Sequence, residues 1–141
     1  MFEILERYHH HGDFEFGKLE NLAEKCNAPR NKSGIYIVFN EKNTLIYIGR
    51  SGHKLCDGTI KHRQDGIYGR LVDGKQFGKA RRNSWPLKMK ERGDERLLVF
   101  WYDTENDNPE TVESILLHEV VKEFGSLPPW NGQLPRVDYE L

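Results

Sequence analysis

Cysteine is scarce in this sequence, and the scarcity excludes several classes of protein. Cys26 and Cys56 are its only two cysteines. They do not form a Cys-x-x-Cys pair, which argues against a zinc knuckle. The N-terminus lacks the basic-then-apolar pattern of a secretion signal. We therefore expect two reduced thiols in a cytoplasmic protein rather than a disulfide.

Long apolar runs are absent as well. Hydrophobic residues make up 37% of the 141 residues, and no apolar segment approaches the roughly 18 residues that a membrane span needs. No internal repeat divides the chain, and neither does a linker rich in proline, glycine or serine. A chain of this length normally forms one domain with its own core. We expect a single domain over residues 1–141 that has no membrane partner.

Net charge is also nearly absent, but the balance hides a segregation along the chain. Residues 1–49 hold 6 Lys and Arg against 7 Asp and Glu. Residues 50–92 hold 12 against 4, and residues 93–141 hold 3 against 11. A basic segment of this strength indicates a nucleic-acid partner. Equally, the basic and acidic segments could neutralise one another in the fold, and charge alone does not decide between the two interpretations.

Residue patterns predict the elements of an α+β domain. The first 30 residues read as helical in two pieces, with a short amphipathic helix over 20–25. Residues 35–39 and 44–48 are rich in β-branched and aromatic side chains, which predicts a β-hairpin. Both strands are almost continuously apolar, so we expect cover on both faces of the sheet. A short helix over 67–73 and a third strand over 97–102 follow.

The last predicted helix has clear signals at both ends. Asn108 is a favourable N-cap, and Pro109 suits the first helical position. Apolar residues from Val112 to Phe124 recur at helical spacing, and Gly125 is a plausible C-cap. The fold class is therefore α+β, with a small, mainly antiparallel, three-stranded sheet flanked by helices.

Two tripeptides stand on the predicted hairpin. Gly34-Ile35-Tyr36 begins the first strand, and Tyr47-Ile48-Gly49 ends the second. In this order and spacing they resemble the naming signature of the GIY-YIG nucleases. The resemblance covers residues 33–132, which leaves 1–32 as an N-terminal helical extension and 133–141 as a tail. It implies metal-dependent hydrolysis of phosphodiester bonds in DNA, with Tyr36 and Tyr47 in the active site.

Three further landmarks of that family can be placed on the chain. The family carries an arginine on the helix after the hairpin, and Arg70 fits this position. It also carries a glutamate on a later helix and an asparagine about twelve residues on. Glu119 and Asn131 have this spacing. The resemblance therefore implies a site of Tyr36, Tyr47, Arg70, Glu119 and Asn131, with Glu119 holding Mg²⁺ or Mn²⁺, and it implies no organic cofactor.

Physical chemistry is compatible with these roles and leaves alternatives open. A carboxylate beside an apolar helical stripe needs a partner, and a hard cation such as Mg²⁺ is one. Glu123 shares nearly the same face as Glu119, and only the spacing to Asn131 favours Glu119. A salt-bridged or half-solvated glutamate would fit the periodicity equally well. The arginine would supply planar donors to a phosphate.

One position departs from the family pattern. Many members have a His or Tyr one helical turn after the arginine, and here that position is Gly74. Tyr68, His62 and Lys75 are candidates to replace it, although Tyr68 points elsewhere on a regular helix. The departure leaves the general base unassigned and raises the alternative of a catalytically inactive relative that only binds nucleic acid.

The basic segment supplies candidate contacts to the DNA backbone. Trp85 in its midst either stacks on a base or anchors the segment in the core, and the adjacent Pro86 favours the anchor. The cations that we expect to face DNA are Arg50, Lys79, Arg81, Arg82, Lys88 and Lys90.

The most favoured function is a metal-dependent DNA endonuclease. A non-catalytic nucleic-acid-binding module on the same scaffold is the second hypothesis, and a protein-interaction domain is the third. The long stretch after Gly49 and the lone-domain length favour a restriction-like or mobile-element role over repair. A homodimer would suit a short target site, although no residue pattern identifies a dimer interface.

Overall fold

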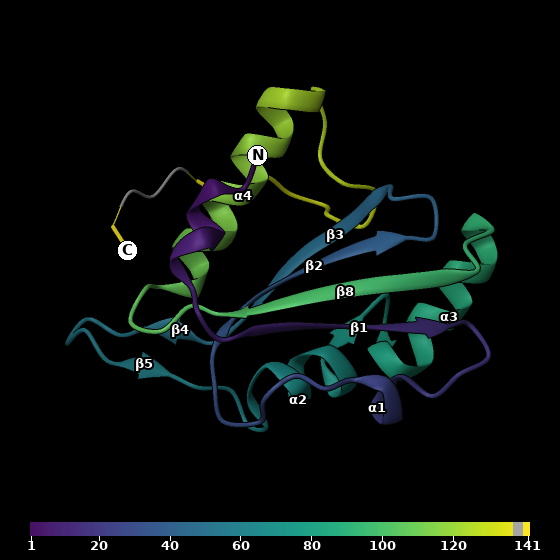
Figure 1. Ribbon diagram of the computed structural model, residues 1–141, viewed down its shortest axis with the longest axis horizontal. Helices are drawn as coiled ribbons and strands as arrows, with labels where there is room; N and C mark the ends of the chain where they lie inside the picture. Colours follow the sequence, from purple (N-terminus) through teal and green to yellow (C-terminus); the bar gives the residue numbers. More distant parts are fainter. Residues whose placement is uncertain (137–139) are drawn as a thin grey trace.

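A four-stranded antiparallel sheet organises the molecule, as the computed structural model shows for residues 1–136 and 140–141 (Figure 1). Its strands are β1 (His11–Gly17), β2 (Gly34–Asn40), β3 (Leu45–Ser51) and β8 (Arg96–Asp103), in the order β1-β8-β2-β3. Each neighbouring pair is antiparallel. The α+β class and the antiparallel sheet are therefore confirmed.

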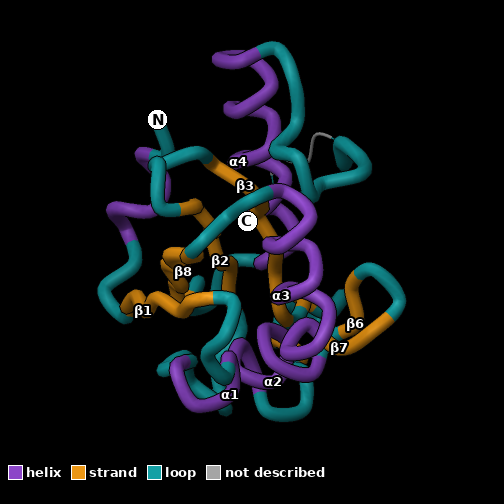
Figure 2. Tube along the Cα trace, turned by 90° about the vertical axis from the view of Figure 1, so that its right-hand side faces the viewer, coloured by secondary structure: helices purple, strands orange, loops and turns teal. Residues whose placement is uncertain are grey.

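Helices cover both faces of this sheet (Figures 1 and 2). The helix α4 (Pro109–Phe124) and the 3-10 helix η1 (Glu3–Arg7) lie on one face. The helices α1 (Leu22–Lys25), α2 (Gly66–Asp73) and α3 (Arg81–Arg92) lie on the other. Two small hairpins stand apart from the sheet, β4 (His53–Lys54) with β5 (Ile60–Lys61), and β6 (Lys75–Gln76) with β7 (Lys79–Ala80).

The strand β1 corrects two expectations. The sheet has four strands rather than three, and the first 30 residues are not wholly helical. This strand carries buried Phe14 and Phe16 alternating with exposed Asp13 and Glu15. That period of two is the pattern of a half-buried strand, but it is short and flanked by glycines. The pairing of β1 with the interior strand β8 then decides its conformation. The short helix expected over 20–25 is present as α1.

The other predicted elements are confirmed. The hairpin, the short helix and the strand correspond to β2–β3, α2 and β8. In α4 the Asn108 side chain accepts a hydrogen bond from the Glu110 amide, and Gly125 ends the helix at φ 80°. Of the expected tail, residues 137–139 lie outside the described part. Its remaining residues run along α4, where the Arg136 and Pro135 carbonyls accept hydrogen bonds from Ser114 and His118.

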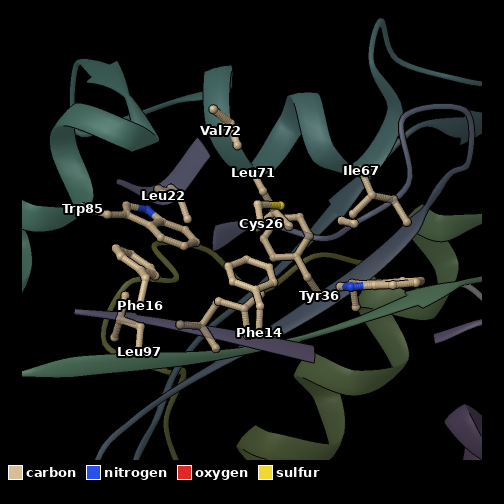
Figure 3. Close-up of a cluster of buried hydrophobic side chains, with 14 of the residues drawn as sticks. Phe14, Phe16, Leu22, Cys26, Tyr36, Ile67, Leu71, Val72, Trp85 and Leu97 are labelled. Carbon is tan, nitrogen blue, oxygen red and sulfur yellow. The ribbon is translucent and has the colours of Figure 1, made fainter. Parts of the chain in front are cut away.

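A mixed aromatic and aliphatic core fills the space between the sheet and α1–α3 (Figure 3). Phe14, Phe16 and Tyr36 point from the strands toward Leu71 and Trp85 of the helices. Trp85 is fully buried, so the interpretation of this residue as a core anchor is confirmed. The core on the other face is mainly aliphatic, with Ile35, Ile37 and Ile48 packed against α4.

The edge strand β3 is closed by the chain after α4. The Trp130 amide donates to the Ile46 carbonyl at 3.0 Å. The Asn131 side chain accepts from the Ile48 amide at 3.0 Å and donates to the Ile48 carbonyl at 2.9 Å. An amide side chain thus pairs with β3 as the peptide group of a neighbouring strand would. This contact fixes the end of the hairpin that carries Tyr47.

Candidate active site at the edge strand

Strand register brings the two tyrosines together. Tyr36 pairs with Gly49 and Tyr47 pairs with Val38, so both rings lie on the face covered by α1–α3. Their centroids are 6.0 Å apart. A Cβ at position 49 would stand 2.5 Å from the Tyr36 ring, closer than such contacts allow. The second tripeptide therefore needs glycine so that the Tyr36 ring can cross β3.

Arg81 fills the position that the family pattern leaves open at Gly74. Its guanidinium donates to the Arg70 carbonyl at 3.1 Å and to the Tyr47 hydroxyl at 3.3 Å. A Cβ at position 74 would stand 2.4 Å from Arg81 Nη1 and 2.3 Å from the Arg70 carbonyl oxygen. The close Arg70 carbonyl therefore requires glycine at this position, and the missing side chain also leaves room for the Arg81 guanidinium. The expectation that Arg81 faces DNA from the surface is wrong, because this residue is 1% exposed.

Polar atoms around the tyrosines are incompletely paired. Among the described residues, the Tyr36 hydroxyl and Arg81 Nε are buried without a hydrogen-bond partner. Burial raises the pKa of the Tyr47 hydroxyl, even though Arg81 acts in the opposite direction. Because Arg81 donates to the Tyr47 oxygen, the Tyr47 proton is free to point toward another acceptor. Each unpaired buried atom costs about 1–3 kcal/mol, which is a cost that functional sites commonly carry.

A basic pocket of about 370 Å³ lies beside α2 and β3. Arg70 of α2 and Arg50 of β3 line it together with His62, which comes from the loop before α2. His62 Nδ1 is 2.6 Å from the Ser33 hydroxyl, which orients the imidazole. Its remaining lining residues are Ser51, Gly52, His53, Lys61 and Arg63. Six of the eight lining side chains are basic and none is acidic, which is the chemistry of an anion site.

Of the three candidates for the unassigned base, only His62 lies in this pocket. The Tyr68 hydroxyl donates to the Ala23 carbonyl at 3.0 Å, and the Arg30 guanidinium covers its ring. Tyr68 thus points away from the pocket, as the helical spacing predicted. Lys75 begins the exposed hairpin that follows α2. His62 was hard to select from sequence because it stands in a stretch with no regular secondary structure.

The structure places Glu113, and not Glu119, beside the two arginines. The Arg50 Nε lies 3.8 Å from a Glu113 carboxylate oxygen. Burial raises the pKa of Glu113 to about 7, and Arg50 and Arg70 act against this shift. Glu113 also contributes to the electrostatic environment of Tyr47. Glu113 is therefore in electrostatic reach of Arg50, Arg70 and Tyr47.

Glu119 has a different neighbourhood, which corrects its expected position. Its carboxylate accepts a hydrogen bond of 2.8 Å from the Phe2 amide, and it lines a hollow with residues 1–3, Lys122 and Glu123. Glu119 lies six residues after Glu113 in the α-helix, which is about 9 Å of rise and about one and two-thirds turns, so the two side chains point about 120° apart. Spacing to Asn131 favoured Glu119, but spacing along the chain does not show which helical face meets β3.

Asn131 lies next to the tyrosines without being free for substrate. Both ends of its side-chain amide are used on Ile48, the central residue of the second tripeptide. We therefore assign Asn131 as a positioning residue rather than a catalytic residue.

The remaining predicted DNA contacts differ in whether their charge is already paired with an acidic side chain. Lys79 and Lys90 are exposed, Arg82 pairs with Asp73, Lys88 pairs with Glu91, and Arg50 pairs with Glu110 and Glu113.

A divalent cation fits this donor set in one specific way. Within the described residues, no group of three or more His, Cys, Asp and Glu side chains could enclose a metal ion. Mg²⁺, however, commonly binds proteins through one or two carboxylates, with waters and substrate phosphates as its other ligands. The half-buried Glu113 carboxylate, beside a pocket suited to phosphate, fits that mode and does not fit a closed structural site.

Comparisons with known proteins identify no family for this chain. No family model matches the chain, and no curated protein or solved structure matches it either. In the described part of the chain, none of the helices has the length and apolar character to cross a membrane. The sequence signature and the arrangement of the site are therefore the two observations that bear on function.

Proposed function

We propose that this chain is a divalent-metal-dependent DNA endonuclease of the GIY-YIG type, with its active site at the β3 edge. The observation that carries the proposal is the convergence of the tyrosine pair, the basic pocket and Glu113. The basic pocket is lined by Arg50, His62 and Arg70, and Arg81 joins the Arg70 carbonyl to the hydroxyl of Tyr47. The restriction-like or mobile-element role belongs to the same proposal.

The basic pocket binds the scissile phosphate. Arg70 offers a flat set of donors that matches two phosphate oxygens, while Arg50 adds a second cation. Arg50 is held by Glu110 at 3.3 Å and by Glu113, so its position is set before substrate arrives. Preorganised donors of this kind stabilise the charge that develops on the phosphoryl oxygens.

Glu113 is the residue that would hold Mg²⁺ or Mn²⁺. When bound, the ion would act as a Lewis acid toward the phosphate and the leaving oxygen. The raised pKa of Glu113, about 7, fits a carboxylate whose buried position lacks a full counter-charge. Such a carboxylate gains most from a cation that neutralises it.

His62 takes the proton of the attacking water. Imidazole is the most common general base in proteins, and the Ser33 contact at 2.6 Å fixes its direction. The water oxygen forms the new bond to phosphorus, its proton passes to His62, and the bond to the leaving oxygen breaks. Tyr47 is a poor proton acceptor because burial raises its pKa. It serves instead as a hydrogen-bond donor to the phosphate, with its hydroxyl oriented by Arg81.

A comparison of Glu113→Gln with Glu119→Gln tests this assignment. We expect Glu113→Gln to lose at least about 10²-fold in plasmid nicking rate with Mg²⁺, because a ligand charge is removed. Glu119→Gln should stay within a fewfold of wild type, since its carboxylate accepts a hydrogen bond from the Phe2 amide and does not line the basic pocket. The measurement is nicking and linearisation of supercoiled DNA, with thermal melting as the control for folding.

Other results would change the proposal in defined ways. A wild-type rate in Glu113→Gln together with loss in Glu119→Gln would move the metal ligand to the position that the sequence favoured. Binding of DNA by the wild type without cleavage in Mg²⁺ or Mn²⁺ would replace the endonuclease by the non-catalytic binding module.

A further inference from the structure

The tip of the β6–β7 hairpin presents an aromatic residue in a strained conformation. Phe77 and Gly78 form its two-residue turn, with φ values of 58° and 85°. Turns of this kind strongly favour Asn-Gly, and a bulky residue at positive φ is unusual. Phe77 is also 41% exposed. A strained phenylalanine with much of its ring in solvent is an unfavourable choice for a tight turn, so its presence at the tip points to a role in binding.

The hairpin is fixed to the body of the protein. Gln76 accepts a hydrogen bond of 2.7 Å from the Trp85 indole and donates one of 3.4 Å to the Trp130 carbonyl. The Phe77 ring meets the Trp130 ring edge-on, with centroids 5.5 Å apart. Figure 2 shows β6 and β7 projecting beside α3. The aromatic ring is therefore presented at a defined place and loses little conformational freedom on binding.

Positive charge surrounds this ring. Lys75 and Lys79 flank the turn, are exposed, and form no salt bridge with any residue that the structure describes. The Lys88 ammonium lies 4.7 Å from the Phe77 ring centroid. Aromatic stacking surfaces set among cations are the means by which proteins bind single-stranded nucleic acid. The matching partner has flat aromatic groups joined by negative charges, which describes the bases and phosphates of DNA.

The hairpin rises directly from the candidate active site. Its base is closed by the Arg81 amide, which donates to the Gly74 carbonyl at 2.9 Å. Arg81 is also the residue that contacts Arg70 and Tyr47. Three residues of extended chain separate Gly74 from Phe77, a distance of roughly 10 Å.

We propose that Phe77 stacks on an unpaired or unstacked base of the DNA strand whose phosphate lies in the Arg50–Arg70 pocket. That the same strand reaches this pocket rests on the proposed function, whereas the stacking itself does not. Lys75 and Lys79 hold the neighbouring phosphates. The preferred substrate is therefore DNA that is single-stranded or locally opened beside the cleavage point, rather than fully stacked duplex.

Three substitutions separate stacking from folding. Phe77→Asn removes the ring but suits positive φ, so thermal stability should be unchanged or raised. Phe77→Tyr keeps the ring. Phe124→Ala is the matched control, because Phe124 is 62% exposed at the C-terminal end of α4. The probe is a short single-stranded oligonucleotide that contains a fluorescent purine analogue, titrated in the presence of a chelator so that no cleavage occurs.

We expect Phe77→Asn to weaken binding by about 5- to 150-fold, the range measured for loss of one base–aromatic stack, and to abolish quenching of the analogue. Phe77→Tyr and Phe124→Ala should bind and quench like wild type. Lys75→Ala/Lys79→Ala should instead flatten the dependence of log K on log salt by about 0.7 for each phosphate that is no longer bound, while Phe77→Asn leaves that slope unchanged.

Opposite results would overturn the inference without touching the endonuclease proposal. Wild-type affinity and quenching in Phe77→Asn, or equal loss in Phe77→Tyr, would show that Phe77 does not stack on a base. Wild-type binding to duplex DNA with no affinity for the single-stranded probe would do the same. Binding of anionic lipid vesicles instead of either DNA would assign the hairpin to a membrane surface. Failure of Glu113→Gln to impair nicking bears only on the catalytic site.

Discussion

The two faces of the central sheet differ in how completely their polar groups are paired. Under α4 and η1 the core is mainly aliphatic, and its buried Tyr8 hydroxyl donates to the Asp107 carboxylate at 2.7 Å. Under α1–α3 the core holds two tyrosines and a buried arginine. Three of the four unpaired buried atoms in the described residues lie there, on Tyr36, Arg81 and Ser84. The first face stabilises the fold, and the second accepts the cost of a polar site.

The largest expected effect is that a substitution on the α1–α3 face lowers the cleavage rate, whereas one on the α4 face lowers stability. Arg70→Lys should lower the nicking rate by about 10²–10³, because lysine cannot offer the paired planar donors, while thermal melting stays close to wild type. Leu116→Ala on the opposite face should lose about 2–5 kcal/mol of unfolding free energy, with normal activity per folded molecule. Both values come from nicking kinetics and denaturant unfolding of the same preparations. A large rate loss in Leu116→Ala, corrected for folded fraction, would remove the distinction.

A smaller effect should distinguish two adjacent arginines. Arg81→Ala should lose about 2–4 kcal/mol of unfolding free energy, because it opens a cavity and removes hydrogen bonds to Arg70 and Tyr47. Arg82→Ala should change stability by about 0.5 kcal/mol or less, since its ion pair with Asp73 is exposed. Arg82→Ala should instead flatten the salt dependence of duplex binding by about 0.9, because one phosphate is no longer neutralised. Similar destabilisation by both substitutions would show that Arg81 is not held as described.

The smallest effect concerns the pH dependence of stability. Burial raises the pKa of Glu113 from 4.5 to about 7, so its contribution to stability is fully present below pH 4.5 and is lost as the pH rises through about 7. Glu113→Gln should therefore match wild type at low pH and exceed its unfolding free energy at pH 8 by on the order of 2–3 kcal/mol. Denaturant unfolding across this range, with chelator present, measures the difference. If Glu113→Gln were less stable than wild type at high pH, the Glu113 carboxylate would not be buried with an incomplete counter-charge.

Local signals in the sequence were sufficient for β2, β3, α2, β8 and α4, but not for β1 or α3. The hairpin carrying Tyr36 and Tyr47, and α4 between Asn108 and Gly125, follow from β-branched residues and from helix caps. The strand β1 did not follow, because its short alternation becomes decisive only through pairing with β8. Short-range patterns were therefore enough to predict β2–β3 and α4, whereas the inclusion of β1 in the sheet depended on contacts between distant segments.

The candidate site could be predicted only where its residues lie on these strong elements. The tyrosines and Arg70 were found from sequence because they lie on the hairpin and on α2. The choice of Glu113 over Glu119 depends on which side of α4 meets β3, which no spacing along the chain reveals. Arg81 and Arg82 are adjacent and chemically identical, so sequence could not show that one is buried. A signal was present at Gly74, whose missing side chain leaves room for the Arg81 guanidinium.

The pairing of residues 130–131 with β3 has a further consequence for the behaviour of the sheet. An edge strand exposes unpaired amide and carbonyl groups, which makes it a template for pairing with other chains. Here the groups of Ile46 and Ile48 that would serve this purpose already bond to Trp130 and Asn131. The contact that holds Tyr47 in place thus also protects the protein from aggregation through the edge beside its site. Selection for solubility and selection for activity would then act on the same asparagine.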